Sequence, residues 1–246
     1  MLGTRRQFFR MGGIAWMFAC LSGALGAEPT YGDPKLPVAG SVLGTTIHTR
    51  DAEELRYVVL GRLLEAFAKE KDISVKAEEI TAYRKAMEEG MAADRAEKQA
   101  AKNVLKRRMA AAGLPKTERQ ALEKELALIE QFLADTAPDK TPQTAEDKQA
   151  LEQIASAFIK HWKVNRALQA SYGGRIGYQQ GGPEPLDATR RFLEERKQRG
   201  DFTIASKALE DAFWSYYQND SLHDFYKPGS KEETQAFSSQ PWAPKK

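Results

Sequence analysis

Apolar side chains recur at intervals of three and four residues along most of this 246-residue chain, and glycines or prolines separate the stretches. Leu55, Val59, Leu63 and Phe67 show the spacing best, and they share one face of a helix because an α-helix turns once every 3.6 residues. Similar patterns predict helices over residues 76–112, 117–133, 144–172, 185–199 and 206–218. The chain is therefore expected to be mainly α, a multi-helix body.

Two stretches favour strands instead. SVLGTTIHT at 41–49 is rich in β-branched residues around a central glycine, which predicts a short N-terminal strand or hairpin. A glycine-rich segment at 171–187 has room for a second short strand near 175–179. Between hairpin and first helix, Asp51 and Glu54 have the spacing of a capping box.

The first 27 residues have the order of an export signal. TRRQFFR at 4–10 places Arg5 and Arg6 before an apolar stretch, and the small residues of SGALGA follow. This order predicts a twin-arginine signal peptide at 1–27 and a periplasmic mature protein. An ordinary secretory leader or an N-terminal anchor helix is the alternative.

Cys20, the one cysteine, lies inside this leader, so the mature chain is expected to form no disulfide. It is also a lipidation candidate, because the small Ala19 precedes it. Residues beyond the leader contain no apolar run of the roughly 20 residues that cross a bilayer, so no transmembrane span is expected in the mature chain.

Charge argues against nucleic acid as a partner. The chain has 37 Lys and Arg against 34 Asp and Glu, and the leader holds three of the arginines and no acid. The mature chain is therefore close to neutral, whereas nucleic-acid binders usually carry excess positive charge.

Segments rich in proline and glycine divide the chain beyond the leader into regions. Residues 28–40 hold three prolines and two glycines and are expected to be a linker, as are residues 137–144. Between the two linkers we expect a helical region at 41–136. After the second linker we expect another helical region at 145–227, which packs on the first, and then an irregular tail at 228–246. One domain and two lobes hinged near 138–142 both remain open.

The order of elements in GTTIHTRDAEELRYVVLGRLLEAFAKEKDISVKAEEI, at 44–80, resembles the N-terminal module of SurA-type periplasmic chaperones. The resemblance covers residues 42–85: a strand with a glycine, an amphipathic helix, a turn between Ile73 and Val75, and a second helix. It implies chaperone-like binding of unfolded or extended polypeptides, outer-membrane proteins among them, in an apolar groove.

GGRIGYQQGG at 173–182 is similar to a signature of the parvulin domains that accompany such modules, with Ile176, Gly177 and Tyr178 in matching places. The chain then continues into two helices, so a complete parvulin domain is not expected. The segment is interpreted as a structured turn. A diverged peptidyl-prolyl cis-trans isomerase that uses residues 172–180 is the enzymatic alternative.

Aromatic residues are the candidates for peptide binding, provided that they are exposed, because at helical spacing they usually close a core. The candidates are Trp162, Tyr172, Tyr178, Phe213, Trp214 and Tyr217.

His48, His161 and His223 are isolated and have no metal-ligand spacing, so neither a metal nor a cofactor is expected. No catalytic residues are assigned, since no nucleophile elbow or phosphate loop occurs. An assembly factor or accessory subunit of an envelope complex is the third interpretation.

Overall fold

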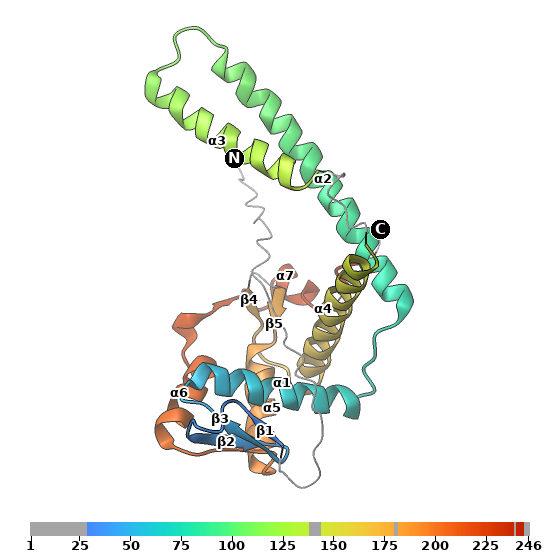
Figure 1. Ribbon diagram of the computed structural model, residues 1–246, viewed down its shortest axis with the longest axis vertical. Coiled ribbons are helices and arrows are strands. Elements are labelled where there is room, and N and C mark those ends of the chain that lie inside the picture. The colour runs from blue at the N-terminus through green and yellow to red at the C-terminus, as the bar shows by residue number, and fades with distance from the viewer. Residues whose placement is uncertain (1–28, 138–143, 180–181, 239, 244–246) are drawn as a thin grey trace. The chain divides into compact units, whose positions relative to one another are not determined.

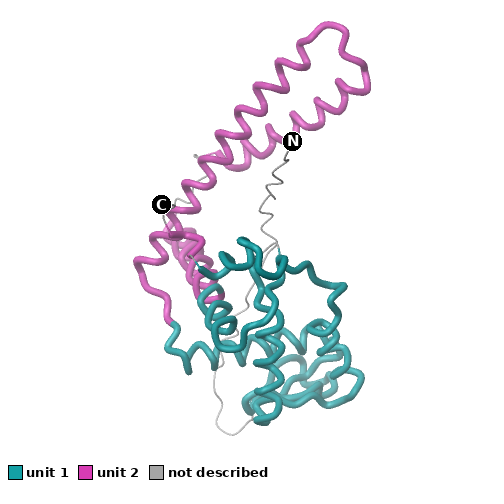
Figure 2. Tube along the Cα trace, turned by 180° about the vertical axis from the view of Figure 1, so that it is seen from behind, with its two compact units in different colours: residues 1–73, 162–239 teal, residues 74–161, 240–246 magenta. Residues whose placement is uncertain are grey.

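The computed structural model describes residues 29–137, 144–179, 182–238 and 240–243. Helices dominate and two small sheets accompany them, which confirms the expected fold class (Figure 1). The chain divides into two compact units (Figure 2): unit 1 comprises residues 1–73 and 162–239, and unit 2 comprises residues 74–161 and 240–246. The predicted leader, with Arg5, Arg6 and Cys20, lies outside the described residues.

The first sheet of unit 1 has the strand order β1-β3-β2-β6. The strands are β1 (Thr30–Tyr31), β2 (Val38–Val42), β3 (Thr45–His48) and β6 (Phe202–Ile204). β2 and β3 form the predicted antiparallel hairpin, and Gly44 turns the chain at φ +77°. At Gly40 a Cβ atom would lie 2.1 Å from the carbonyl oxygen of Thr203, so β6 can approach β2 only because this residue is glycine.

The expected linker at 28–40 is wrong in part, because it contains β1 and the start of β2. The amide of Thr46 donates a 3.0 Å hydrogen bond to the carbonyl of Pro29, and β1 runs parallel to β3. Ala39 is fully buried. The partner strand β6 lies far along the sequence, and local composition carries no sign of it.

Helix α1 (Ala52–Glu70) supplies one side of the unit 1 core. It begins at Asp51, whose carboxylate accepts a 2.7 Å hydrogen bond from the amide of Glu53. The Glu54 carboxylate accepts from the Thr49 hydroxyl at 2.5 Å, so the expected capping box is not formed. The buried face of α1 packs with α5 (Leu186–Gln198), α6 (Lys207–Gln218) and part of α4 (Ala145–Tyr172), through Leu55, Val59, Leu63, Phe67, Val164, Leu168, Phe192, Leu193, Phe213 and Tyr217.

The second sheet of unit 1 has the order β5-β4-β7. Its strands are β4 (Gly177–Gln179), β5 (Gly182–Glu184) and β7 (Asp224–Phe225), and a 3₁₀ turn η2 (Asp220–Leu222) precedes β7. β4 lies within the range 175–179 where a second short strand was predicted. It pairs antiparallel with both neighbours.

Unit 2 is built around a long helical hairpin. α2 (Ala77–Met109) and α3 (Lys116–Asp135) lie side by side and are joined by a turn in which Gly113 has φ +81° (Figure 1). The N-cap of α2 is Lys76, the first residue of the predicted range 76–112, and the Glu79 carboxylate accepts a 2.9 Å hydrogen bond from the Lys76 amide. The first part of α4 also belongs to unit 2.

The unit boundaries differ from the two helical regions expected at 41–136 and 145–227. One boundary follows Ile73 and the other lies inside α4, between His161 and Trp162. The reason is that an apolar stripe identifies a helix but not the helix against which it packs. The tail expected to be irregular from 228 contains a short helix, α7 (Lys231–Gln235), which the Ser230 side chain caps. None of the helices in the described part of the chain is both long and apolar enough to span a bilayer.

Candidate functional site

The six aromatic candidates have different surroundings. Phe213 and Tyr217 are four residues apart on the inner face of α6 and belong to the unit 1 core, and Trp162 is only 4% exposed. Tyr172 and Trp214 are half-buried against the same core. Tyr178 is 42% exposed. Half of the candidates are thus packing residues in this structure, and Tyr178 is the one that is open to a ligand.

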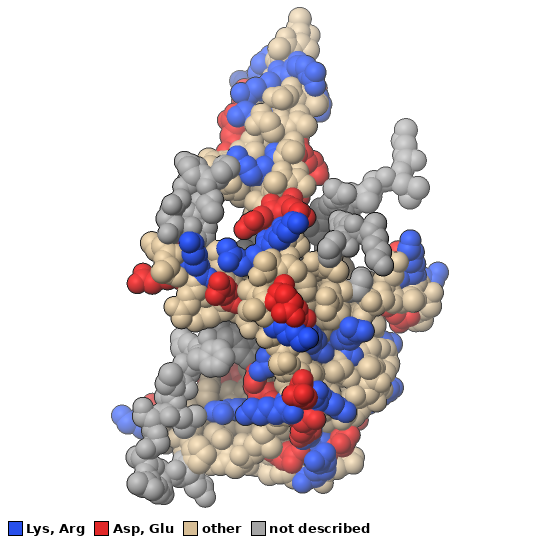
Figure 3. Space-filling model, turned by 90° about the vertical axis from the view of Figure 1, so that its right-hand side faces the viewer, with Lys and Arg blue, Asp and Glu red and all other residues tan. Residues whose placement is uncertain are grey.

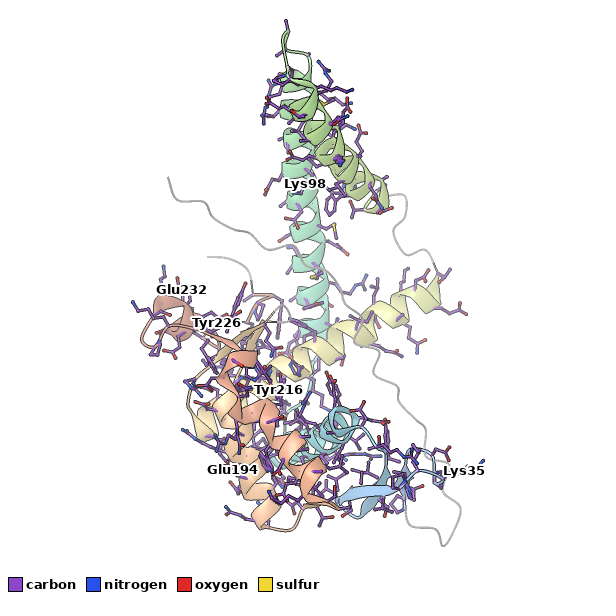
Figure 4. The ribbon with its side chains drawn as sticks, turned by 90° about the vertical axis from the view of Figure 1, so that its left-hand side faces the viewer. Lys35, Lys98, Glu194, Tyr216, Tyr226 and Glu232 are labelled. Atoms are coloured by element: carbon purple, nitrogen blue, oxygen red, sulfur yellow. The ribbon has the colours of Figure 1, made fainter. Side chains whose placement is uncertain are left out.

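Tyr178 stands on β4 beside Tyr226, which Figure 4 labels. The two rings are 5.6 Å apart in an edge-to-face arrangement. Burial raises the pKa of the Tyr226 phenol, which is therefore neutral at physiological pH. The pair is an amphipathic aromatic surface on the second sheet of unit 1.

The glycine-rich loop that precedes β4 is firmly held. Gly174 has φ +103°, and a Cβ atom there would lie 2.5 Å from the Cβ of Asp187. The Arg175 guanidinium makes paired hydrogen bonds to the carboxylates of Asp187, at 3.0 and 3.1 Å, and Asp220, at 2.7 and 3.0 Å. Burial opposes the charge on Asp187, but the hydrogen bonds of Arg175 outweigh it and lower the pKa of that carboxyl. Arg175 therefore fastens the loop to the start of α5 and to η2.

A polar cluster surrounds Tyr216, which lies in the last turn of α6 (Figure 4). This cluster was not predicted from the sequence. The Tyr216 hydroxyl lies 3.3 Å from the nearer carboxylate oxygen of Glu184 and accepts a 3.1 Å hydrogen bond from the Gln179 amide. The His223 ring packs edge-on at 4.7 Å, with its Nε2 2.5 Å from the Tyr216 carbonyl. The guanidinium of Arg56 lies 3.9 Å from the centre of the Tyr216 ring. Arg56 and Tyr216 are 160 positions apart in the sequence and meet here, and spacing alone gives no sign of that.

Burial controls the electrostatics of this Tyr216 cluster. It raises the pKa of the Glu184 carboxyl, and nearby His223 and the hydrogen bonds of Tyr216 and Gln179 offset only part of the effect. Burial also raises the pKa of the Tyr216 phenol, and the negative charge of Glu184 raises it further. The groups satisfy one another, and the cluster holds the second sheet against α6 and α1.

Unit 2 exposes several large apolar side chains. Among the described residues of the whole chain, twelve large apolar side chains are exposed, and six of these belong to unit 2. We call these six the unit 2 apolar surface; they are 37–68% exposed and comprise Met87, Met91, Val104, Leu128, Leu151 and Ile154. Only Leu105, Leu122 and Ile129 are buried between α2 and α3. Contiguous exposed apolar patches are typical of interaction surfaces, whereas single exposed apolar residues are ordinary.

Four members of this surface extend from one aromatic cluster in unit 2. The Tyr83 ring on α2 lies 5.0 Å from that of Phe158 on α4, and each lies 6.2 Å from Trp242. Met87 and Met91 follow Tyr83 by four and eight residues, whereas Ile154 and Leu151 precede Phe158 by four and seven. These intervals keep them on nearly the same faces of their helices. Apolar side chains thus continue outward from the cluster along both helices.

Metal-ligating residues are scattered. Within the described ranges, no three His, Cys, Asp or Glu side chains are grouped as a metal ion requires. The Nδ1 of His48 is 2.9 Å from the carbonyl of Leu36, and burial lowers the pKa of His161. Thr81, Arg84, Lys85 and Glu88 line an open surface depression on α2.

Comparison with protein-family models, with curated proteins and with solved structures finds no match to this chain. The resemblance of residues 42–85 to the SurA-type module stays a prediction. Function is therefore inferred from the geometry of the two units.

Proposed function

We propose that this is a periplasmic helical protein that binds unfolded or extended polypeptides transiently, as a chaperone does. The observation that carries the proposal is the unit 2 apolar surface, in which six large apolar side chains stand exposed on α2, α3 and α4. Its two methionines are unbranched and flexible, and such side chains adapt to ligands of different shape.

The expected affinity suits transient binding. Covering the exposed part of one such side chain contributes about 1 kcal/mol, at about 25 cal/mol per Å² of apolar surface. All six together contribute about 6 kcal/mol, which barely exceeds the lower estimates, about 4 kcal/mol, for the cost of association. We therefore expect weak and rapidly reversible binding, with little dependence on the sequence of the client.

The exposed Tyr178 beside Tyr226 is a second contact that fits the same function. A tyrosine pair offers apolar ring faces and polar hydroxyl groups, so it can contact a polypeptide without demanding one sequence. We expect it to add affinity for aromatic-rich segments of outer-membrane proteins.

The test is an aggregation-suppression titration of residues 28–246 against an unfolded β-barrel protein. The wild-type chain should slow aggregation, and the double variant Met87→Gln, Met91→Gln should slow it much less. The matched control, Val38→Gln with Leu222→Gln, changes two side chains of unit 1 that are 51% and 58% exposed, and should behave as wild type.

Prolyl-peptide isomerisation is measured on the same samples. Acceleration of isomerisation without suppression of aggregation would replace the proposal by the isomerase alternative. Absence of both, together with co-purification of one stoichiometric partner, would favour an assembly factor. Equal suppression by the methionine variant and wild type would show that the unit 2 apolar surface is not the binding site.

A further inference from the structure

The turn of the α2–α3 hairpin gathers positive charge that the sequence as a whole lacks. Between residues 106 and 119 there are five cationic side chains and one acid, Glu118. Figure 3 shows lysine and arginine side chains around the upper end of the hairpin, next to uncharged atoms at the turn itself. We call residues 106–119 the hairpin tip; its cations are Lys106, Arg107, Arg108, Lys116 and Arg119.

Ion pairing within the chain leaves most of this charge uncompensated. Arg108 pairs with Glu118 at 3.2 Å, and Lys106 shares Glu130 with Lys102. Arg107, Lys116 and Arg119 have no carboxylate within ion-pair distance in the described part of the chain, and the first two are exposed. The hairpin tip therefore presents a net positive surface.

Helix stability explains only part of this arrangement. Lys106, Arg107 and Arg108 occupy the last turn of α2, where cations interact favourably with the negative end of the helix dipole. Lys116 and Arg119 lie at the start of α3, where the dipole disfavours positive charge. The dipole of α3 therefore does not account for these two cations, and an external anionic partner would.

The residues between the cations indicate which anionic partner fits. The turn is formed by Ala110, Ala111, Ala112, Gly113, Leu114 and Pro115, all exposed except the half-buried Leu114. Small apolar groups flanked by lysine and arginine suit the boundary of a bilayer, where cations meet phosphates and apolar groups enter the headgroup layer. Nucleic acid fits less well, since residues 106–119 contain no aromatic side chain for base stacking.

We propose that the hairpin tip docks the protein on the surface of anionic phospholipid bilayers. Docking of this kind does not depend on the proposed polypeptide binding, which uses other side chains. It would keep an exported protein at the membrane surface without a transmembrane segment.

The test is co-sedimentation of the mature chain with vesicles in which roughly a third of the phosphatidylcholine is replaced by phosphatidylglycerol. The wild-type chain should sediment with these vesicles, less so as salt rises, and should not sediment with pure phosphatidylcholine. The triple variant Arg107→Gln, Lys116→Gln, Arg119→Gln should bind about a hundredfold more weakly, since each cation near such a surface contributes about a fivefold factor.

Two control variants test whether vesicle binding depends on the hairpin tip or only on the total positive charge of the chain. Lys35→Gln, Lys227→Gln and Lys231→Gln remove three exposed cations from unit 1 and should leave vesicle binding within about twofold. Arg107→Lys, Lys116→Arg and Arg119→Lys keep the charge and should bind as wild type. The proposal is overturned by equal binding to both kinds of vesicle, by an unchanged glutamine variant, by an equal loss in the unit 1 control, or by duplex DNA binding in place of vesicle binding.

Discussion

Glu184 is the residue at which burial and charge are most directly opposed. Its carboxyl lies 3.3 Å from the Tyr216 hydroxyl, and desolvation raises its pKa above the ordinary value of 4.5. A raised pKa means that the folded protein binds this proton more tightly than the unfolded chain does. Its contribution to stability is therefore complete below 4.5 and is lost as pH rises through the folded-state pKa.

We predict that Glu184→Gln removes this loss. The amide is nearly isosteric and can still accept from the Tyr216 hydroxyl, so the variant should gain stability relative to wild type on going from pH 4 to pH 7. Urea unfolding at both values measures the difference. Glu232→Gln, at an exposed residue of α7, controls for the removal of one negative charge. A difference between variant and wild type that is the same at both values would contradict the assignment.

Among single residues, the sequence predicted the role of those that depend only on their neighbours in the chain. Asp51 was expected to begin a helix and does so, because a cap requires only its own chain neighbours. Tyr178 was named as a peptide-binding candidate on the condition that it is exposed, and it is 42% exposed. Arg56, Glu184 and Tyr216 were not assigned any role, since their meeting depends on the packing of α1, β5 and α6.

The α2–α3 hairpin has an unusually thin core for its length. A 33-residue helix and a 20-residue helix bury only Leu105, Leu122 and Ile129 between them. Each of these side chains therefore carries a large share of the hairpin's stability. Local opening of the hairpin should require less free energy than unfolding of unit 1.

Leu122→Ala should destabilise the hairpin by about 3 kcal/mol, because Leu122 is 4% exposed and its removal leaves a cavity. Amide hydrogen exchange in α2 and α3 should accelerate by roughly a hundredfold. Leu128→Ala makes the same change on the same helix at a side chain that is 68% exposed, and should cost less than about 0.5 kcal/mol. Equal acceleration in the two variants would show that the hairpin is not held by this core.

Helices were predicted well because their signal is periodic and local. The ends at Ser206, Pro185 and Gly173 fall where capping residues and glycines indicated. Strands were predicted where β-branched residues cluster, as at 45–48, and near 175–179, where β4 lies. β1 and β6 are short and exist through pairing with distant partners, so composition could not reveal them.

Unit 1 consists of two segments of the chain, and residues 74–161, the larger part of unit 2, lie between them in the sequence. We predict that unit 1 folds when residues 74–161 are replaced by a flexible Gly/Ser linker of about 15 residues, which has a mean span of about 22 Å. Urea unfolding followed by circular dichroism should remain cooperative. The matched control replaces residues 202–218, which belong to unit 1, and should abolish cooperative unfolding. Loss of cooperativity in the first variant would mean that unit 1 needs unit 2.

The close pairing of β2 with β6 at Gly40 can form only late in synthesis. Ser41 on β2 contacts Thr203 on β6, and the 162 positions between them take a ribosome on the order of ten seconds to make. The α2–α3 hairpin is complete well before that. A newly made chain therefore passes through a stage in which the hairpin is formed while one edge of the first sheet is still open. During that interval the unpaired edge of β2, which includes Gly40, can pair with another chain, and it is the part of the protein that a folding helper would need to shield.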